Sequence, residues 1–221
     1  SVLTIDCDPQ GNLSMSVAAE NQDSATMYEV MKGTVSAREA IQHTPSCDII
    51  PANTILAGIE QELHNVGKEM TLREKLRDEQ TGVAEAYDYI LIDCPPSLGL
   101  LTVNALVAAD KLLIPIQCEF YALEGVTKLL ESMKRVKSRL NPTLDIYGIL
   151  LTMYDSRTTL SKQVVDEVRE YFGRLVFTTP IPRTVKLSEA PSFGQPITQY
   201  DPKGRGALSY IELAKEVIAR G

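Results

Sequence analysis

The chain has 221 residues and a mass of 24.4 kDa, which suits one domain of ordinary size or two very small ones. Hydrophobic residues make up 44% and charged residues 23%, so the composition excludes a disordered chain. The net charge is −7, and no apolar run reaches the roughly 18 residues of a bilayer-spanning helix, which excludes a transmembrane protein.

The charge is unevenly distributed. Residues 1–119 carry 7 Lys/Arg and 18 Asp/Glu, whereas residues 120–221 carry 15 Lys/Arg and 11 Asp/Glu. A basic half on an acidic protein can hold a site for a polyanion that the total charge conceals. The alternative interpretation is ordinary scatter of surface charge.

The cysteines and histidines do not form a metal-binding pattern. There are two histidines, and the four cysteines are far apart and contain no CxxC pair, so we do not expect a structural zinc site. Scattered thiols favour a reducing cytoplasm. The residues concerned are Cys7, Cys47, Cys94, Cys118, His43 and His64.

Short apolar runs alternate with helix-length segments along the chain. Several runs are continuous in Ile, Leu and Val, which is typical of strands covered on both faces. The alternation predicts an α/β fold with a mostly parallel twisted sheet, helices on both faces and right-handed crossovers. No repeat or linker is visible, so we expect a single domain over residues 1–221. The predicted strands are residues 2–5, 47–51, 87–92, 111–117, 146–152, 175–180 and 196–199.

The clearest helix is predicted over residues 123–140. Its apolar residues recur at helical spacing, and Lys and Arg crowd the other positions. Asn141 and Pro142 end it. Residues 208–219 show a second apolar pattern at helical spacing.

Acidic residues follow two of the predicted strands. Asp6 and Asp8 come after the first strand, and Asp93 ends the segment YDYILID. Ligands of open parallel sheets bind beyond the carboxyl ends of the strands, and carboxylates that converge there suit a hard cation such as Mg²⁺ with a phosphate ligand.

The YDYILID segment has the form of a Walker B strand, whose aspartate can hold the water shell of magnesium. Taken alone the pattern is weak, because an Asp at a strand end often caps the next helix. Pro95 and Pro96 follow Asp93 closely and make the turn after this strand stiff.

Residues 6–12, DCDPQGN, resemble the DxDPQGN switch of the ParA/Soj family of chromosome- and plasmid-partitioning ATPases, which are relatives of MinD. The family's IDxPPSLG element has its counterpart in residues 92–99. Further segments match the family pattern in the same order along the chain: residues 101–106, 117–125, 151–157, 181–194 and 200–206. The resemblance implies a P-loop NTPase-like fold that uses ATP and Mg²⁺.

The resemblance also implies roles for the acidic residues. Asp8 is expected to orient the attacking water, although an aspartate before Pro9 could equally be a helix N-cap. Asp6 is expected to support the water shell of magnesium, and Asp93 is expected to be the Walker B aspartate.

The remaining nucleotide contacts follow in the same way. Pro95 and Pro96 are expected to form the second switch, which senses the γ-phosphate. Met153, Pro182 and Arg183 fall where the family encloses the adenine, and for Met153 a place in the core is the alternative.

Family members bind DNA non-specifically as ATP-bound homodimers and act with a ParB-like centromere-binding partner in the cytoplasm, on the nucleoid. Phosphate contacts need only exposed positive charge, so no base-reading motif is expected. Each basic residue singly can be mere solvated surface. The candidates for DNA contact are Arg157, Lys162, Arg183, Lys186, Lys203 and Arg205.

The departure from the family is the phosphate loop KGGVGKT, which family members carry before the DxDPQGN switch on a central strand. No GxxxxGK[ST] pattern occurs in the chain. We therefore expect an N-terminally truncated member that does not hydrolyse ATP alone, with unpaired edges on the strands at 87–92 and 111–117.

Two alternatives stay open. One is a natural relative that has lost nucleotide binding and works as a regulator or partner-binding module. The other is a MinD-like membrane-positioning ATPase, which would need a basic amphipathic tail after the last helix. No such tail follows residues 208–219, so we expect no membrane association.

Overall fold

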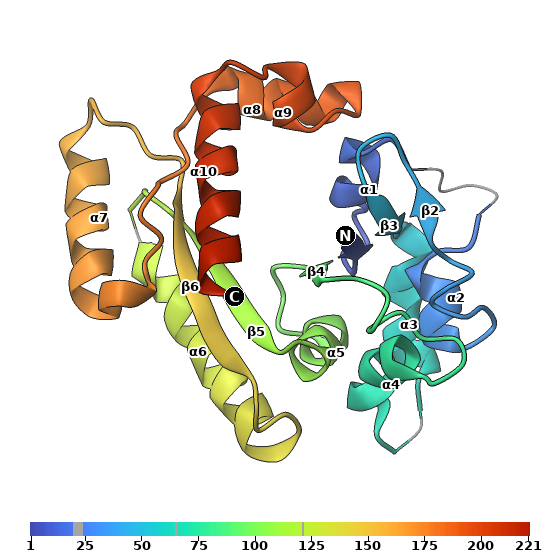
Figure 1. The fold of residues 1–221 in the computed structure, drawn as a ribbon. Coiled ribbons are helices and arrows are strands. Elements are labelled where there is room, and N and C mark those ends of the chain that lie inside the picture. Colours follow the sequence, from blue (N-terminus) through green and yellow to red (C-terminus); the bar gives the residue numbers. More distant parts are fainter. Residues whose placement is uncertain (20–23, 65, 121) are drawn as a thin grey trace. The chain divides into compact units, whose positions relative to one another are not determined.

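The computed structural model of the chain describes residues 1–19, 24–64, 66–120 and 122–221 (Figure 1). These residues form two compact units. Unit 1 consists of residues 1–110 and 135–143, and unit 2 consists of residues 111–134 and 144–221.

Unit 1 contains a four-stranded sheet with the order β2–β3–β1–β4. The strand β1 (Val2–Asp6) pairs in parallel with β3 (Asp48–Ile50) on one side and with β4 (Tyr89–Asp93) on the other. An antiparallel edge strand, β2 (Gln42–His43), completes the sheet. The sequence predicted the three parallel strands but not β2, because two residues are too few to show a periodic pattern.

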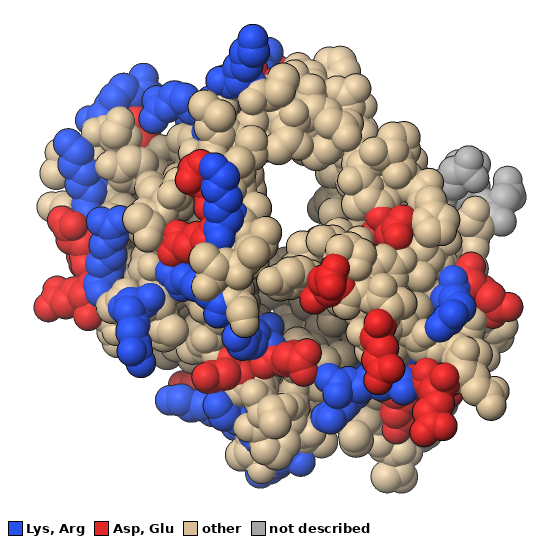
Figure 2. Space-filling model, in the orientation of Figure 1, with Lys and Arg blue, Asp and Glu red and all other residues tan. Residues whose placement is uncertain are grey.

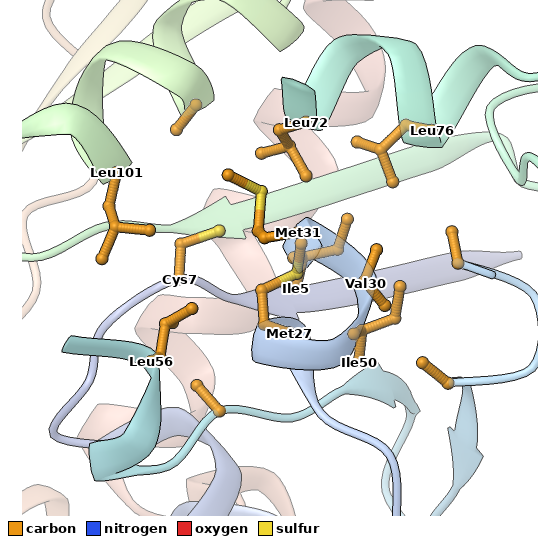
Figure 3. Close-up of a cluster of buried hydrophobic side chains, with 14 of the residues drawn as sticks. Ile5, Cys7, Met27, Val30, Met31, Ile50, Leu56, Leu72, Leu76 and Leu101 are labelled. Carbon is orange, nitrogen blue, oxygen red and sulfur yellow. The ribbon is translucent and has the colours of Figure 1, made fainter. Parts of the chain in front are cut away.

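Short helices surround this sheet. Figure 3 shows side chains of β1, α2 and α4 meeting in the apolar core, with Ile5 beside Met27 and Val30. The helices of unit 1 are α1 (Asn12–Ser16), α2 (Met27–Lys32), η1 (Thr54–Gly58), α3 (Ile59–Glu62), η2 (Lys68–Met70), α4 (Thr71–Arg77) and α5 (Leu100–Ala108).

Unit 2 contains the parallel pair β5 (Lys111–Gln117) and β6 (Asp145–Thr152). The long helix α6 (Ala122–Arg139) confirms the helix predicted over residues 123–140, and its last residues count with unit 1. The other helices are α7 (Thr159–Phe172), η3 (Gly173–Leu175), α8 (Val185–Glu189), η4 (Ala190–Phe193), α9 (Ile197–Tyr200) and α10 (Arg205–Arg220).

Both faces of β6 are covered by helices. Ile149 and Leu151 lie in a buried cluster with residues of α6 and α7, such as Val165. Leu150, which points to the opposite face, clusters with Leu213 of α10. Continuous apolar strands covered on two sides confirm the predicted α/β fold with a mainly parallel arrangement.

A glycine in β6 allows an aromatic ring to approach the strand. A Cβ atom on Gly148 would lie 2.4 Å from the Phe177 ring, which is fully buried. Any larger residue at this position must therefore displace the ring or the strand.

Two predicted strands are wrong. Residues 175–180 begin at the last residue of η3 and contribute only one bridge, between Val176 and Ile149. Residues 196–199 are mostly helix α9, because Pro196 supplies the extended residue before the first turn and Ile197 is buried against Ala207. The β-branched Ile197 and Thr198 suggested a strand, but tertiary packing overrides this propensity.

Within the described residues, β4 pairs only with β1 and β5 only with β6, so each has one edge without a strand partner. Leu91 in β4 is 56% exposed. These edges agree with the two unpaired strands expected from the sequence. No helix in the described part of the chain is both long enough and apolar enough to cross a bilayer.

Candidate functional site

The carboxyl ends of β1 and β4 bring two predicted site residues together, because Asp6 and Asp93 are register partners in the parallel ladder. Asp6 is completely buried. Its Oδ1 accepts the Asp8 N–H at 3.0 Å, and its Oδ2 accepts the N–H and the hydroxyl of Ser14 at 2.9 and 2.7 Å. Both oxygens of Asp6 therefore hold the turn that follows β1.

Ser14 is a partner that the sequence did not reveal. It is buried in α1, and its hydroxyl also accepts the Ala52 N–H at 2.9 Å after β3. Asp6, Ser14 and Ala52 thus connect three segments of unit 1. No sequence signal marks Ser14 except its position shortly after the acidic motif.

Asp8 lies on this turn and is half-buried. Its Oδ1 accepts the Gln10 N–H at 2.9 Å, which forms a local turn. The proposed N-cap role is wrong, because α1 begins at Asn12 and its N-cap residue is Gly11. Among the described residues, no other hydrogen bond to the Asp8 carboxylate is found.

Gly11 is required by the geometry of the same turn. Its φ of 64° lies in the left-handed region. A Cβ atom there would also lie 2.9 Å from the Ala52 carbonyl oxygen. The glycine of the DCDPQGN motif therefore lets the chain pass close to the segment after β3.

Asp93 is exposed to solvent, yet its environment disfavours the charged form. Desolvation by surrounding protein raises the pKa of Asp93 to about 6, and the charges of Asp6 and Asp8 add to this effect. The carboxylates of Asp6 and Asp8 thus repel that of Asp93. A cation would relieve this repulsion.

The described residues contain no group of three or more His, Cys, Asp or Glu side chains arranged to bind a metal ion. Because the Asp6 oxygens are already engaged, the exposed Asp93 is the better placed carboxylate to contact the water shell of a cation. One exposed carboxylate suits a hydrated Mg²⁺ ion, because this ion keeps several of its waters and needs only one or two carboxylates from the protein.

The proline turn after β4 is held from α5. Thr102 donates its hydroxyl hydrogen to the carbonyl oxygens of Ser97 at 2.6 Å and Pro95 at 3.3 Å. Pro95 is half-buried and Pro96 is exposed. The structure thus places the predicted second switch directly beside Asp93.

In unit 2, the loop after β6 gathers the residues expected around adenine. A parallel bridge pairs Tyr154 with Pro182, and the Arg183 N–H donates to the Tyr154 carbonyl oxygen at 2.9 Å. Met153 has a φ of 55°, which is rare for a residue other than glycine. Met153, Pro182 and Arg183 therefore lie close together at the carboxyl end of β6.

Arginines surround Asp155 in the same loop. Arg157 donates two side-chain hydrogen bonds to the Asp155 carboxylate, at 2.9 and 2.7 Å, although Arg157 is 86% exposed. This pair, helped by Arg183, holds the pKa of Asp155 well below its usual range. Arg183 also lies 3.8 Å from a carboxylate oxygen of Glu119.

A second group of basic residues lies in and around the short helices that precede α10. Lys186 in α8 pairs with Glu189 at 2.9 Å, and Lys203 and Arg205 lie exposed near the start of α10. Lys162 is exposed in the first turn of α7. Figure 2 shows Lys and Arg spread over the visible face of unit 2, with Asp and Glu between them.

Comparisons with known proteins agree along the whole chain. Residues 1–146 match a family model described as AAA domain. The chain is 48% identical to the sporulation initiation inhibitor protein Soj of Bacillus subtilis (strain 168) over 224 residues, which cover 100% of this chain and 87% of Soj. It is 47% identical to the chromosome partitioning protein ParA of Caulobacter vibrioides (strain NA1000 / CB15N), with 99% and 83% covered.

Among solved structures, the chain is similar to cobyrinic acid a,c-diamide synthase from Mycobacterium smegmatis with bound ADP and magnesium. The TM-score is 0.83 at 36% sequence identity, and the match covers 98% of this chain and 81% of the other.

Proposed function

Because the chain belongs to the ParA/Soj family of chromosome- and plasmid-partitioning ATPases, we propose that it binds ATP with Mg²⁺ and couples hydrolysis to DNA partition. The observation that carries this proposal is the register pairing of Asp6 with Asp93, with Asp8 two residues further on. This arrangement gathers carboxylates at the carboxyl ends of the strands, where ligands of parallel sheets bind.

We assign a different role to each carboxylate. Asp93 contacts the water shell of Mg²⁺, which neutralises phosphate charge when it is bound. Asp8, whose backbone N–H is held by Asp6, orients the attacking water. Asp6 is a positioning residue, because its oxygens accept hydrogen bonds from Asp8 and Ser14.

The turn after β4 in unit 1 and the loop after β6 in unit 2 are further candidates for nucleotide contact, each within its own unit. Pro95 and Pro96 form a stiff turn shortly after Asp93, so they can report the presence of a γ-phosphate to α5 through Thr102. Met153, Pro182 and Arg183 contact the base. The phosphate cradle is not among these contacts, because no GxxxxGK[ST] pattern occurs in residues 1–221.

For the DNA step, we propose that the ATP-bound protein dimerises and holds DNA of any sequence through exposed Lys and Arg of unit 2. The partner that stimulates release is a ParB-like centromere-binding protein, and the site of action is the nucleoid in the cytoplasm. Support comes from the +4 balance of residues 120–221, from 15 basic and 11 acidic residues, and from the exposure of the six candidates.

The second candidate function is that of a family member that works as a regulator or partner-binding module and does not hydrolyse ATP. The two functions differ in one measurement. ATP turnover by the complete protein, with Mg²⁺ and DNA present, supports the ATPase, and partner binding without turnover supports the regulator.

Asp93→Asn sharpens this test. The substitution removes the negative charge at the sheet edge and is expected to lower Mg²⁺-dependent turnover by about tenfold or more. Asp110→Asn, which changes an exposed carboxylate that pairs with Arg77, is the matched control and should keep normal turnover. Equal turnover in both variants would show that Asp93 is not part of the site.

A further inference from the structure

Two of the four cysteines, Cys7 and Cys94, follow the carboxyl ends of the neighbouring strands β1 and β4. The Cys7 N–H donates to the Asp93 carbonyl oxygen at 2.8 Å, which continues the parallel ladder one step beyond the Asp6–Asp93 pair. In this pattern, Cys7 and Cys94 are the next register partners. Neighbouring strands lie about 4.8 Å apart, within the Cα separation of about 4.4–6.8 Å that disulfides span.

The side chains of this pair share one environment. Cys7 is 1% exposed within the apolar core of unit 1, and Cys94 is half-buried and packs against that core. The pKa of Cys7 is raised by burial first and by the nearby Cys94 next, so the two thiols are close enough to interact. Figure 3 shows Cys7 in this core, between Leu101 and Ile5.

We propose that Cys7 and Cys94 are a disulfide-forming modification site that hydrogen peroxide oxidises. Cys94 is the more accessible thiol. Its sulfur attacks one oxygen of the peroxide and the O–O bond breaks, so that one water is released and Cys94 becomes a sulfenic acid. Cys7 sulfur then attacks the Cys94 sulfur, and the S–O bond breaks to release a second water. The two thiols lose two electrons and two protons, and the peroxide is reduced to two waters.

The remaining cysteines offer no comparable partner. Cys47 precedes β3 at the opposite end of the sheet, where Asp48 pairs with Leu3, and its sulfur lies 3.5 Å from the Thr4 hydroxyl oxygen. Cys118 lies in unit 2. Selective oxidation of one pair is therefore expected.

The position of the pair suggests a consequence for activity, which rests on the proposed function. Cys7 lies between Asp6 and Asp8, and Cys94 lies between Asp93 and Pro95. A disulfide would tie the two segments that we propose as switches to each other. Turnover is then expected to fall in proportion to the fraction of cross-linked protein.

Peptide mapping tests the disulfide without any assay of activity. Trypsin places the four cysteines in four peptides, which end at Lys32, Lys68, Lys111 and Lys128. After hours with excess hydrogen peroxide and alkylation of free thiols, mass spectrometry should find the peptide ending at Lys32 joined to residues 78–111. Because Cys94 is only partly accessible to solvent, the reaction is given hours rather than minutes.

Variants and activity then complete the test. Cys94→Ser should abolish the link, and Cys47→Ser, the matched control, should keep it. In the complete protein, peroxide should lower ATP turnover, dithiothreitol should restore it, and Cys94→Ser should be insensitive to both.

The outcomes are separable. A link between other cysteines, or a Cys94 sulfinic acid with Cys7 still reduced, overturns the proposal. Full turnover in fully linked protein overturns the regulatory consequence alone. No turnover in reduced protein contradicts the proposed function, while the peptide map still decides the disulfide.

Discussion

Unit 1 and unit 2 use charge in different ways. In unit 1, the fully buried Asp6 accepts three hydrogen bonds, one from Asp8 in the turn after β1 and two from Ser14 in α1. In unit 2, charged residues form pairs at the surface, such as Arg157 with Asp155, over apolar clusters on both faces of β6. Buried charge is thus part of the fold of unit 1, whereas the surface charge of unit 2 is available to a partner.

The two kinds of charged group also differ in how much they contribute to the free energy of unfolding. A hydrogen bond to a buried charged group contributes about 1.5–3 kcal/mol, and its loss also leaves donors without partners. An exposed ion pair contributes about 0–1 kcal/mol. Changes to the charges of unit 2 should therefore alter binding with little effect on stability, whereas loss of the Asp6 carboxylate should lower the stability of unit 1.

The largest effect is expected from Asp8→Ala. If Asp8 orients the attacking water, ATP turnover of the complete protein falls about 10²- to 10⁴-fold. ATP affinity should change little, and the variant should accumulate as an ATP-bound dimer on size-exclusion chromatography. Asp110→Ala, which removes an exposed carboxylate of unit 1, controls for the loss of charge. Loss of ATP binding by Asp8→Ala would place this residue in nucleotide binding and not in the chemical step.

The next effect concerns the basic residues of unit 2. Changing Arg183, Lys186 and Lys203 together to Glu should weaken ATP-dependent binding to DNA of any sequence by about a hundredfold, since each lost phosphate contact removes counterion release. The slope of log affinity against log salt should flatten by about one unit per contact. Fluorescence anisotropy over a salt series measures both.

Two controls make the DNA experiment specific. The charge-matched reversal of Lys32, Arg73 and Arg77 in unit 1 should leave the salt slope unchanged. Lys186→Glu with Lys203→Glu should keep ATP binding, and Arg183→Glu is tested alone because Arg183 is also proposed to contact the base. An unchanged slope in the unit 2 variant would move the DNA surface elsewhere, with the basic residues of α6 as the next candidates.

A third effect tests the buried charge itself. Asp6→Ala leaves the N–H groups of Asp8 and Ser14 without their acceptor, so the free energy of unfolding is expected to fall by about 3 kcal/mol. Arg157→Ala in unit 2 removes an exposed partner of Asp155 and should cost less than about 1 kcal/mol. Urea denaturation of both variants measures the difference, and equal losses would contradict the contrast between the units.

The sequence predicted the elements whose patterns are continuous. The strand at 111–117 and the helix at 123–140 are confirmed as β5 and α6, because uninterrupted apolar runs and helical spacing are local signals. The position of Asp93 at a strand end is equally local. These features depend on neighbours in the chain and not on distant contacts.

What the sequence could not predict depends on distant contacts. The hydrogen bonds of Ser14 to Asp6 and Ala52 need the fold of three segments, and no spacing rule indicates them. Pro196 and Ile197 looked like the start of a strand, but burial against Ala207 makes this segment helical. The sequence allows Asp8 as an N-cap, but the left-handed conformation of Gly11 makes Gly11 the N-cap residue and α1 begins at Asn12.

The smallest effect tests whether packing, and not charge, stabilises unit 2. Gly148→Ala places a Cβ atom 2.4 Å from the Phe177 ring, so the ring or β6 must shift, and such overpacking costs about 1–3 kcal/mol. Gly125→Ala is the matched control, because in the described part of the chain no neighbouring heavy atom lies within 4 Å of its added Cβ, and alanine favours the helix by up to about 1 kcal/mol. Urea denaturation should therefore shift in opposite directions for the two variants. Combining Gly148→Ala with Phe177→Leu should reduce the cost of the first substitution, since the smaller side chain makes room for the new methyl group. If Gly148→Ala is neutral in both backgrounds, the close approach of Phe177 to β6 does not contribute to the stability of unit 2.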